Sequence, residues 1–191
     1  MKGCPPLSAK ELRLALRHLR GRYKLRDRAL LVLGVRTGMR ISELLSLHIG
    51  QTFDGTAVLP RVYLQRSSTK GKRHGASIAL HPKAVAALRK WITSRGPVSA
   101  DDWLFPSQRA PGRAMGRHAA WHILHRAFIA AGVTVMAGTH AMRKSFCANV
   151  HRALGGDLFR LAKAMRHSSP LTTLSYLSFR QDEIDRAILR A

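Results

Sequence analysis

Hydrophobic positions recur at helical spacing along most of this chain, and the first fifth contains the clearest examples. Residues 26–37 are apolar nearly all round, which predicts a buried helix, and Gly38 is expected to end it. Ser8 and Glu11 have the spacing of a capping box, so an earlier helix is expected to begin at Ser8. One face of that earlier helix is apolar through Leu12, Ala15, Leu16 and Leu19.

One short region alternates between apolar and polar positions, unlike the helical segments around it. Residues 56–66 and 76–80 alternate as strands do, and glycines beside them supply turn positions. We therefore expect a small three-stranded antiparallel sheet. Lys70 is expected in the hairpin between its last two strands.

Capping residues and apolar stripes predict the remaining helices. Residues 97–117 are rich in proline, glycine, serine and arginine, so a loop is expected there, pinned to the core by Trp103-Leu104-Phe105. The short helix near the C-terminus is expected to carry Tyr176. The starts expected for these helices are Ser42, Pro82, residue 118, Thr139, Asp157, Ser169 and residue 181.

The charge balance narrows the class of partner. Lysine and arginine number 33 against 10 aspartates and glutamates, which gives a formal net charge of +23. Such an excess destabilises a compact domain by self-repulsion unless a polyanion is its normal partner, and nucleic acid is the first candidate. A membrane is disfavoured because the charge is spread along the chain and no apolar run reaches the ~18 residues of a span.

The remaining composition fits one cytoplasmic domain without metal. Hydrophobic residues make up 46% of the 191-residue chain, enough for the core of one domain or of two small ones. Cys4 and Cys147 are too few for a disulfide framework or a zinc site, so both are interpreted as reduced thiols. His118, His122 and His125 could share a helix face, but no carboxylate or cysteine accompanies them. A polar face that is partly buried or turned to DNA is favoured over a metal site.

Four short motifs carry residue types suited to phosphodiester chemistry. Arg40 lies in Thr-Gly-Met-Arg-Ile-Ser-Glu-Leu, and Arg143 lies in His-Ala-Met-Arg, where His140 shares its helix face. Lys70 lies in the basic run Lys-Gly-Lys-Arg-His, and Tyr176 ends the run Thr-Thr-Leu-Ser-Tyr. Cutting a phosphodiester without metal requires cations on its non-bridging oxygens. Arginine meets this need because its planar fork binds phosphate through two hydrogen bonds.

Together these motifs resemble the catalytic signature of the tyrosine recombinases, the phage integrase family, from about Leu7 to about Phe179. The resemblance implies a mainly α-helical catalytic domain with a small sheet, shared with type IB topoisomerases. It implies site-specific recombination of double-stranded DNA, in which Tyr176 attacks the scissile phosphate and forms a 3′-phosphotyrosyl bond. This bond stores the energy for rejoining, so neither a metal nor another cofactor is expected. Family members assemble as homo-tetramers on paired sites. The same assembly is expected here on DNA, and a monomer is expected free in solution.

The resemblance also implies a role for each site residue. Arg40 and Arg143 would clamp the phosphate, and Glu43 would orient the neighbouring cations. Lys70 would protonate the leaving oxygen, because nearby like charges lower the proton affinity of an ammonium, with Lys72 as the alternative. His140 would bind the phosphate or move the tyrosine proton. The expected site comprises Arg40, Glu43, Lys70, His140, Arg143, His167 and Tyr176, with Lys72, Arg73 and Arg166 as DNA contacts.

The chain departs from the family pattern at three points. Arg166 stands where the family has the glycine of Leu-Gly-His, and Ala141 stands where an aspartate often follows the histidine. Most relatives also carry a separate DNA-binding domain before the catalytic one. Its absence here fits a natural short form, as in the fimbrial phase-switch invertases, or an isolated catalytic fragment. The expected organisation is a tail over 1–7, a catalytic domain over 8–180, and a helix over 181–191 that docks on a neighbouring protomer or on its own core.

Two other functions use the same features and stay open. A site-independent topoisomerase would use the same residues, and a catalytically idle DNA-binding regulator would keep the charge without forming an adduct. A nuclease or phosphatase is disfavoured, because such enzymes need carboxylates or metal and this chain has only 10 acidic residues.

Overall fold

A computed structural model gives the fold and describes residues 5–65, 75–133, 137–167 and 169–177, with 185, 188 and 189. The chain separates into two compact units, Met1–Phe146 and Cys147–Ala191, with the boundary inside one helix. Lys70, Lys72, Arg73 and most of the predicted helix at 181–190 lie outside the described residues.

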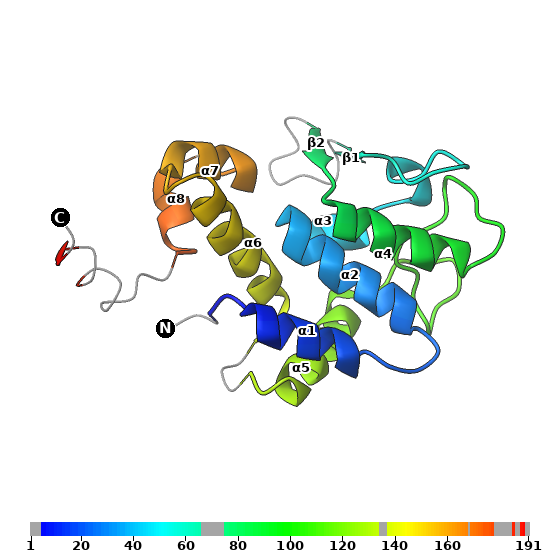
Figure 1. Ribbon diagram of the computed structural model, residues 1–191. Helices are drawn as coiled ribbons and strands as arrows, with labels where there is room; N and C mark the ends of the chain where they lie inside the picture. The colour runs from blue at the N-terminus through cyan, green and yellow to red at the C-terminus, as the bar shows by residue number, and fades with distance from the viewer. Residues whose placement is uncertain are drawn as a thin grey trace. The chain divides into compact units, whose positions relative to one another are not determined.

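The described part of the chain is mainly helical with a small antiparallel sheet (Figure 1). In the part of the chain that the structure describes, no helix is both long and apolar enough to cross a membrane. The elements are α1 (Ala9–His18), α2 (Lys24–Thr37), α3 (Ile41–Leu45), the 3-10 helix η1 (Ile49–Gln51), β1 (Arg61–Leu64), β2 (Ala76–Ala79), α4 (Pro82–Thr93), α5 (Arg117–Ala130), α6 (Thr139–Ala153), α7 (Leu158–Met165) and α8 (Pro170–Leu174).

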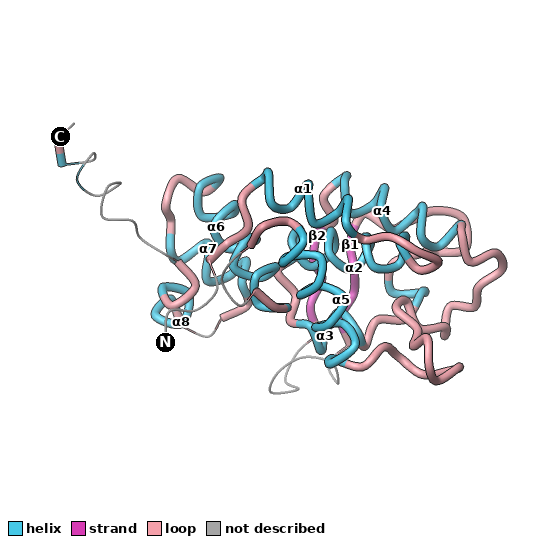
Figure 2. Tube along the Cα trace, turned by 90° about the horizontal axis from the view of Figure 1, so that it is seen from below, coloured by secondary structure: helices cyan, strands magenta, loops and turns pink. Residues whose placement is uncertain are grey.

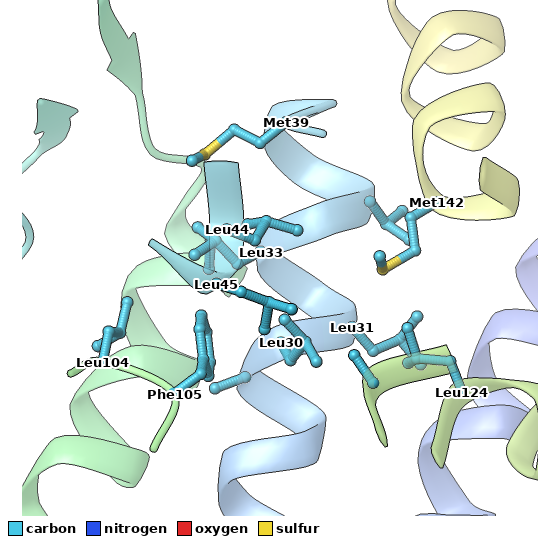
Figure 3. Close-up of a cluster of buried hydrophobic side chains, with 14 of the residues drawn as sticks. Leu30, Leu31, Leu33, Met39, Leu44, Leu45, Leu104, Phe105, Leu124 and Met142 are labelled. Atoms are coloured by element: carbon cyan, nitrogen blue, oxygen red, sulfur yellow. The ribbon is translucent and has the colours of Figure 1, made fainter. Parts of the chain in front are cut away.

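Helix α2 forms the centre of the first unit's core. Nine of its 14 residues are buried, which confirms the helix predicted from its all-round apolar sequence. Figure 3 shows Leu30, Leu31 and Leu33 of α2 among apolar side chains from α3, α5, α6 and the loop at 104–105. A side chain at Gly34 would overlap the sulfur of Met142, so this glycine allows α6 to pack close against α2. The fold that carries the candidate site therefore depends on this one helix.

A buried arginine at the start of α2 fixes the long loop to that helix. Arg26 is fully buried, and its Nε and Nη2 donate to Asp27 Oδ1 at 2.9 and 2.7 Å. Burial raises the pKa of Asp27, while the adjacent guanidinium opposes the rise. Arg26 Nη1 also donates to the carbonyl of Pro106 at 3.0 Å. Leu104 and Phe105 are fully buried beside it, which confirms that the loop is pinned to the core.

The sheet has two strands among the described residues, so the prediction of three is wrong. β1 pairs antiparallel with β2, from Arg61 opposite Ala79 to Leu64 opposite Ala76, and Figure 2 shows the two strands side by side. Of the strand predicted over 56–66, only Arg61–Leu64 forms, and its start is held in a turn instead. The carboxylate of Asp54 accepts the N–H groups of residues 56 and 57 at 2.9 and 2.8 Å, and only an isolated bridge follows.

Helix caps were predicted well in some places and badly in others. The Ser8–Glu11 capping box is present, and Asp157 caps α7 by accepting the N–H of Arg160 at 2.9 Å. Ser42 does not cap α3, because the N-cap is Arg40, two residues earlier, and Ser42 lies inside the helix. Helix α8 ends at Leu174, so Tyr176 lies in the turn after it rather than on it.

Candidate active site

Arg40 lies at the N-cap of α3, where a buried carboxylate holds it. Glu43 is 1% exposed, and its Oε2 accepts the backbone N–H of Arg40 at 2.7 Å. Its Oε1 accepts a hydrogen bond from the Arg40 guanidinium at 3.1 Å, while the Arg40 side chain stays 31% exposed. One carboxylate therefore orients both the backbone and the side chain of the arginine. The positioning role expected for Glu43 stays a prediction, and the guanidinium remains accessible to an anion.

Arg143 meets the same stretch of chain from α6. It is 2% exposed, and its Nη1 donates a hydrogen bond to the carbonyl of Gly38, two residues before Arg40. Gly38 ends α2 in the left-handed conformation, with φ of 61°, and a side chain there would overlap the ring of Phe146. The glycine thus allows the turn and the close approach of α6. The structure brings Arg143 to the turn that presents Arg40.

His140 is exposed at the second position of α6, one helical turn before Arg143. Residues three apart on a helix are neighbours on its surface, so both side chains project from the same face of α6. His140 is exposed on that face, whereas Arg143 is buried. In the first unit the structure therefore gathers Arg40, Glu43 and Arg143 around the α2–α3 turn, with His140 on the adjoining turn of α6. Lys70, Lys72 and Arg73 lie outside the described residues.

The second unit brings His167 and Tyr176 together. Their ring centroids are 5.2 Å apart, with an angle of 42° between the ring planes. His167 Nδ1 lies 2.9 Å from Oγ1 of Thr173, which is fully buried and lies in α8. The backbone N–H of Tyr176 returns to the carbonyl of Thr173 at 3.0 Å. Thr173 therefore fixes both residues, although the sequence had marked it only as part of the Thr-Thr motif.

Arg166 holds an unusual backbone conformation directly before His167. It ends α7 in the left-handed region with φ of 55°, and no other non-glycine among the described residues has positive φ. The N–H of Arg166 bonds the carbonyl of Lys163, and the N–H of His167 bonds that of Ala162, both at 3.0 Å. These two bonds form a Schellman motif, in which glycine usually occupies the left-handed position. The turn that places His167 therefore explains why this position favours glycine in the family pattern.

Arg166→Gly is expected to raise the free energy of unfolding by roughly 0.5–1 kcal/mol, because glycine adopts the left-handed conformation without the strain of a side chain. Urea-induced unfolding of the full chain would measure the change. Arg166→Ala is the matched control: it also removes the guanidinium but keeps the Cβ, so it should not raise the free energy of unfolding. Equal stabilisation by both substitutions would show that the side-chain charge, and not the backbone, carries the cost.

The two groups offer complementary chemistry for an anionic ester. The first presents a carboxylate-oriented arginine beside a second arginine, which suits the non-bridging oxygens of a phosphate. The second presents a phenol beside an imidazole, which suits nucleophilic attack with movement of a proton. His118 and His122 contact each other through Nε2 atoms 3.1 Å apart, and His125 binds the carbonyl of Ala137. In the described ranges, no group of three or more metal-ligating residues could hold a metal ion.

Comparison with known proteins gives concordant matches. The phage integrase family model matches residues 6–183. The chain is 30% identical over 163 residues to the tyrosine recombinase XerD of Corynebacterium glutamicum, covering 84% of this chain and 50% of that protein. It is 26% identical over 157 residues to the probable integrase/recombinase YoeC of Bacillus subtilis, covering 82% of this chain and 80% of that one. The chain thus spans about half the length of the XerD relative.

A solved structure matches the fold over nearly the whole chain. The XerH site-specific recombinase, bound to a palindromic difH substrate in a post-cleavage complex, superposes with a TM-score of 0.78 at 25% sequence identity. The match covers 96% of this chain and 51% of XerH. Both the sequence and the fold of these 191 residues therefore point to the same family.

Proposed function

Because the chain belongs to the phage integrase family, we propose that it cuts and rejoins DNA strands at specific sites through a bond between Tyr176 and a 3′-phosphate. The observation that carries the proposal is the contact of Tyr176 with His167, whose ring is oriented by the buried Thr173. XerH, a site-specific recombinase that was solved bound to a palindromic difH substrate, shares the fold. A net charge of +23 also favours a polyanionic partner, and double-stranded DNA is one.

In the first step, Tyr176 Oη attacks the phosphorus, an Oη–P bond forms, and the bond from phosphorus to the 5′-oxygen breaks. The phenolic proton passes to a histidine, His140 or His167. The 5′-oxygen leaves as a hydroxyl after taking a proton from Lys70. Both proton transfers are of the general acid–base kind. The products are a 3′-phosphotyrosyl bond and a free 5′-hydroxyl.

Arg40 and Arg143 stabilise the charge that builds up on the non-bridging oxygens during the attack. Preorganised donors act strongly here because they need no rearrangement at the moment of reaction. The buried carboxylate of Glu43 preorganises Arg40, and the Gly38 carbonyl orients Arg143 by accepting one of the guanidinium's five N–H donors. Lys72, Arg73 and Arg166 contact the DNA backbone.

In the second step, the 5′-hydroxyl of a partner strand attacks the phosphotyrosyl bond and releases Tyr176. The reaction exchanges one phosphoester for another, so it consumes no ATP. Exchange between two duplexes requires a homo-tetramer on paired sites. In this proposal, residues 8–180 form the catalytic domain, and the segment 181–191 contacts a neighbouring protomer.

The test is to trap the intermediate on nicked duplexes in which cleavage releases a short 5′-hydroxyl fragment, so that rejoining cannot occur. A panel taken from the DNA that flanks the gene supplies candidate sites. Recombination predicts a protease-sensitive adduct on one panel member and strand exchange on that member alone. Relaxation of any supercoiled plasmid, without site dependence, would assign a topoisomerase instead. DNA binding without adduct on the panel or on plasmid would assign an idle regulator.

Binding to duplex DNA is expected to weaken steeply with salt. Each phosphate that a cation neutralises contributes roughly 0.9 to the slope of log affinity against log salt, so five or more contacts give a slope steeper than about −4. Fluorescence anisotropy with a labelled duplex at several salt concentrations measures the slope. A slope near −1 would argue against DNA as the polyanionic partner.

A further inference from the structure

Helices α1, α2 and α4 enclose a groove that the catalytic proposal does not use. Its volume is about 750 Å³, and Figures 1 and 2 show α1 and α4 on the same side of α2, with α2 as the floor between them. All three helices belong to the first unit. The lining residues are Ala9, Leu12, Arg13, Leu16, Arg17, Leu25, Arg28, Val32, Val35, Arg36, Lys83, Ala86, Ala87 and Lys90.

The lining follows helical periodicity on every wall. The positions from α1, α2 and α4 recur at intervals of three, four or seven residues, so each helix contributes one continuous stripe. On α4 the stripe contains Ala86 and Ala87, whose small side chains leave the groove open. Arg28 closes the junction of α1 and α2 by donating from Nε to the carbonyl of Leu16 at 2.9 Å. The groove is therefore a defined feature of the helix packing.

The groove combines an apolar floor with a basic rim. Eight of its 14 lining residues are apolar, and five of them (Leu12, Leu16, Leu25, Val32 and Ala87) pack against the core while only partly buried. The other six are arginine or lysine, and none of the described residues that line it is acidic. Arg13 and Arg17 stand exposed on the α1 side, with Lys83 and Lys90 exposed on the α4 side. An occupant must therefore cover apolar surface and carry negative charge at both edges.

We propose that this groove binds an amphipathic helix of another protein, one that presents an apolar stripe flanked by aspartate and glutamate. A helix laid in a groove buries its apolar stripe along the floor, and its flanking carboxylates then reach cations on both rims. The DNA backbone would use the rim charges but offers nothing that buries leucine and valine side chains. A partner of this kind would attach to the first unit through a surface that includes neither Arg40 nor Arg143.

The probe is a synthetic helical peptide of about 14 residues, or roughly four turns, with leucines along one face and glutamates on both sides of it. A second peptide of the same composition, with its leucines spread around the helix, is the control. Anisotropy with labelled peptides should show at least about tenfold tighter binding of the amphipathic peptide. Equal affinity of the two peptides would overturn the proposal, because simple charge attraction would then suffice.

Three variants of the full chain test the groove itself. Arg13→Glu with Arg17→Glu should weaken the amphipathic peptide by about tenfold or more, since both exposed rim charges reverse. Arg109→Glu with Arg113→Glu is the control: it makes the same change in net charge at exposed loop positions outside the groove. This variant should keep most of the affinity for the amphipathic peptide. Ala87→Trp keeps every cation but fills the groove, so it should also block the peptide.

The outcomes separate this proposal from general attraction and from DNA binding. Equal loss of peptide affinity in the two charge-reversed variants would overturn it, as would full affinity in Ala87→Trp. Duplex DNA is titrated in parallel. If Ala87→Trp weakens DNA binding as much as peptide binding, the groove is a DNA-binding surface and the proposal fails. Circular dichroism melting of each variant shows that the fold persists, and because peptide binding is independent of cleavage, loss of the catalytic proposal would not affect this test.

Discussion

Tyr176→Phe is expected to abolish covalent attachment to DNA while leaving the fold and DNA binding intact. The substitution removes only the phenolic oxygen, which is the atom that would bond to phosphorus. The phenyl ring keeps its position 5.2 Å from His167, and the backbone bond to Thr173 does not involve the side chain. The measurement is the yield of protease-sensitive adduct on nicked duplexes, alongside anisotropy for DNA affinity. A nucleophile cannot be replaced by its neighbours, so the loss should be complete.

The other tyrosines provide matched controls. The chain has three tyrosines, and Tyr23→Phe and Tyr63→Phe remove the same atom elsewhere. Tyr23 packs under the guanidinium of Arg26 through its ring face, which phenylalanine retains, and Tyr63 is 52% exposed on β1. Both control variants should form adduct at the wild-type level. An adduct that persists in Tyr176→Phe and disappears in one of the controls would transfer the nucleophile to that tyrosine.

Local signals in the sequence predicted the helices well because their causes are local. The capping box at Ser8, the proline that opens α4 and the glycine that ends α2 each act within one helical turn. The third strand was the main error. Residues 56–66 were predicted to form a strand, but only Arg61–Leu64 does so, because the carboxylate of Asp54 captures the N–H groups of residues 56 and 57 into a turn. A side chain that competes for backbone donors in this way is invisible to periodicity.

The residues of the candidate site were named from the sequence and stay a prediction, whereas the contacts that hold several of them came from the structure. Arg40 and Glu43 are three residues apart, so their contact could be expected from helix geometry. The contact of Arg143 with Gly38 spans 105 positions in the chain, and nothing local indicates it. The sequence marked Thr173 only as part of the Thr-Thr motif, and its burial and its contact with His167 became visible in the structure. Contacts that depend on long-range packing therefore could not be predicted from periodicity or motif spacing.

Lys70→Ala is expected to slow cleavage by about 10²–10⁴, because the leaving 5′-oxygen would depart as an alkoxide without its proton donor. Lys72→Ala is the matched control, since it removes an ammonium of the same kind two positions away. Its effect should fall mainly on DNA affinity, because a backbone contact binds the ground state and the transition state alike. Single-turnover cleavage at saturating protein separates the two effects, since it reports chemistry after binding is complete.

Substitution of sulfur at the bridging 5′ position assigns the acid directly. A thiol, with a reference pKa near 8.5, leaves without a proton donor, so the sulfur substrate should restore cleavage by Lys70→Ala to near the wild-type rate. The same substrate should leave Arg143→Ala largely unrescued, because that arginine is proposed to act on the non-bridging oxygens. Rescue of Lys72→Ala but not of Lys70→Ala would exchange the roles of the two lysines. Rescue of neither would place the acid elsewhere, and His140, exposed one turn before Arg143, is the next candidate to substitute.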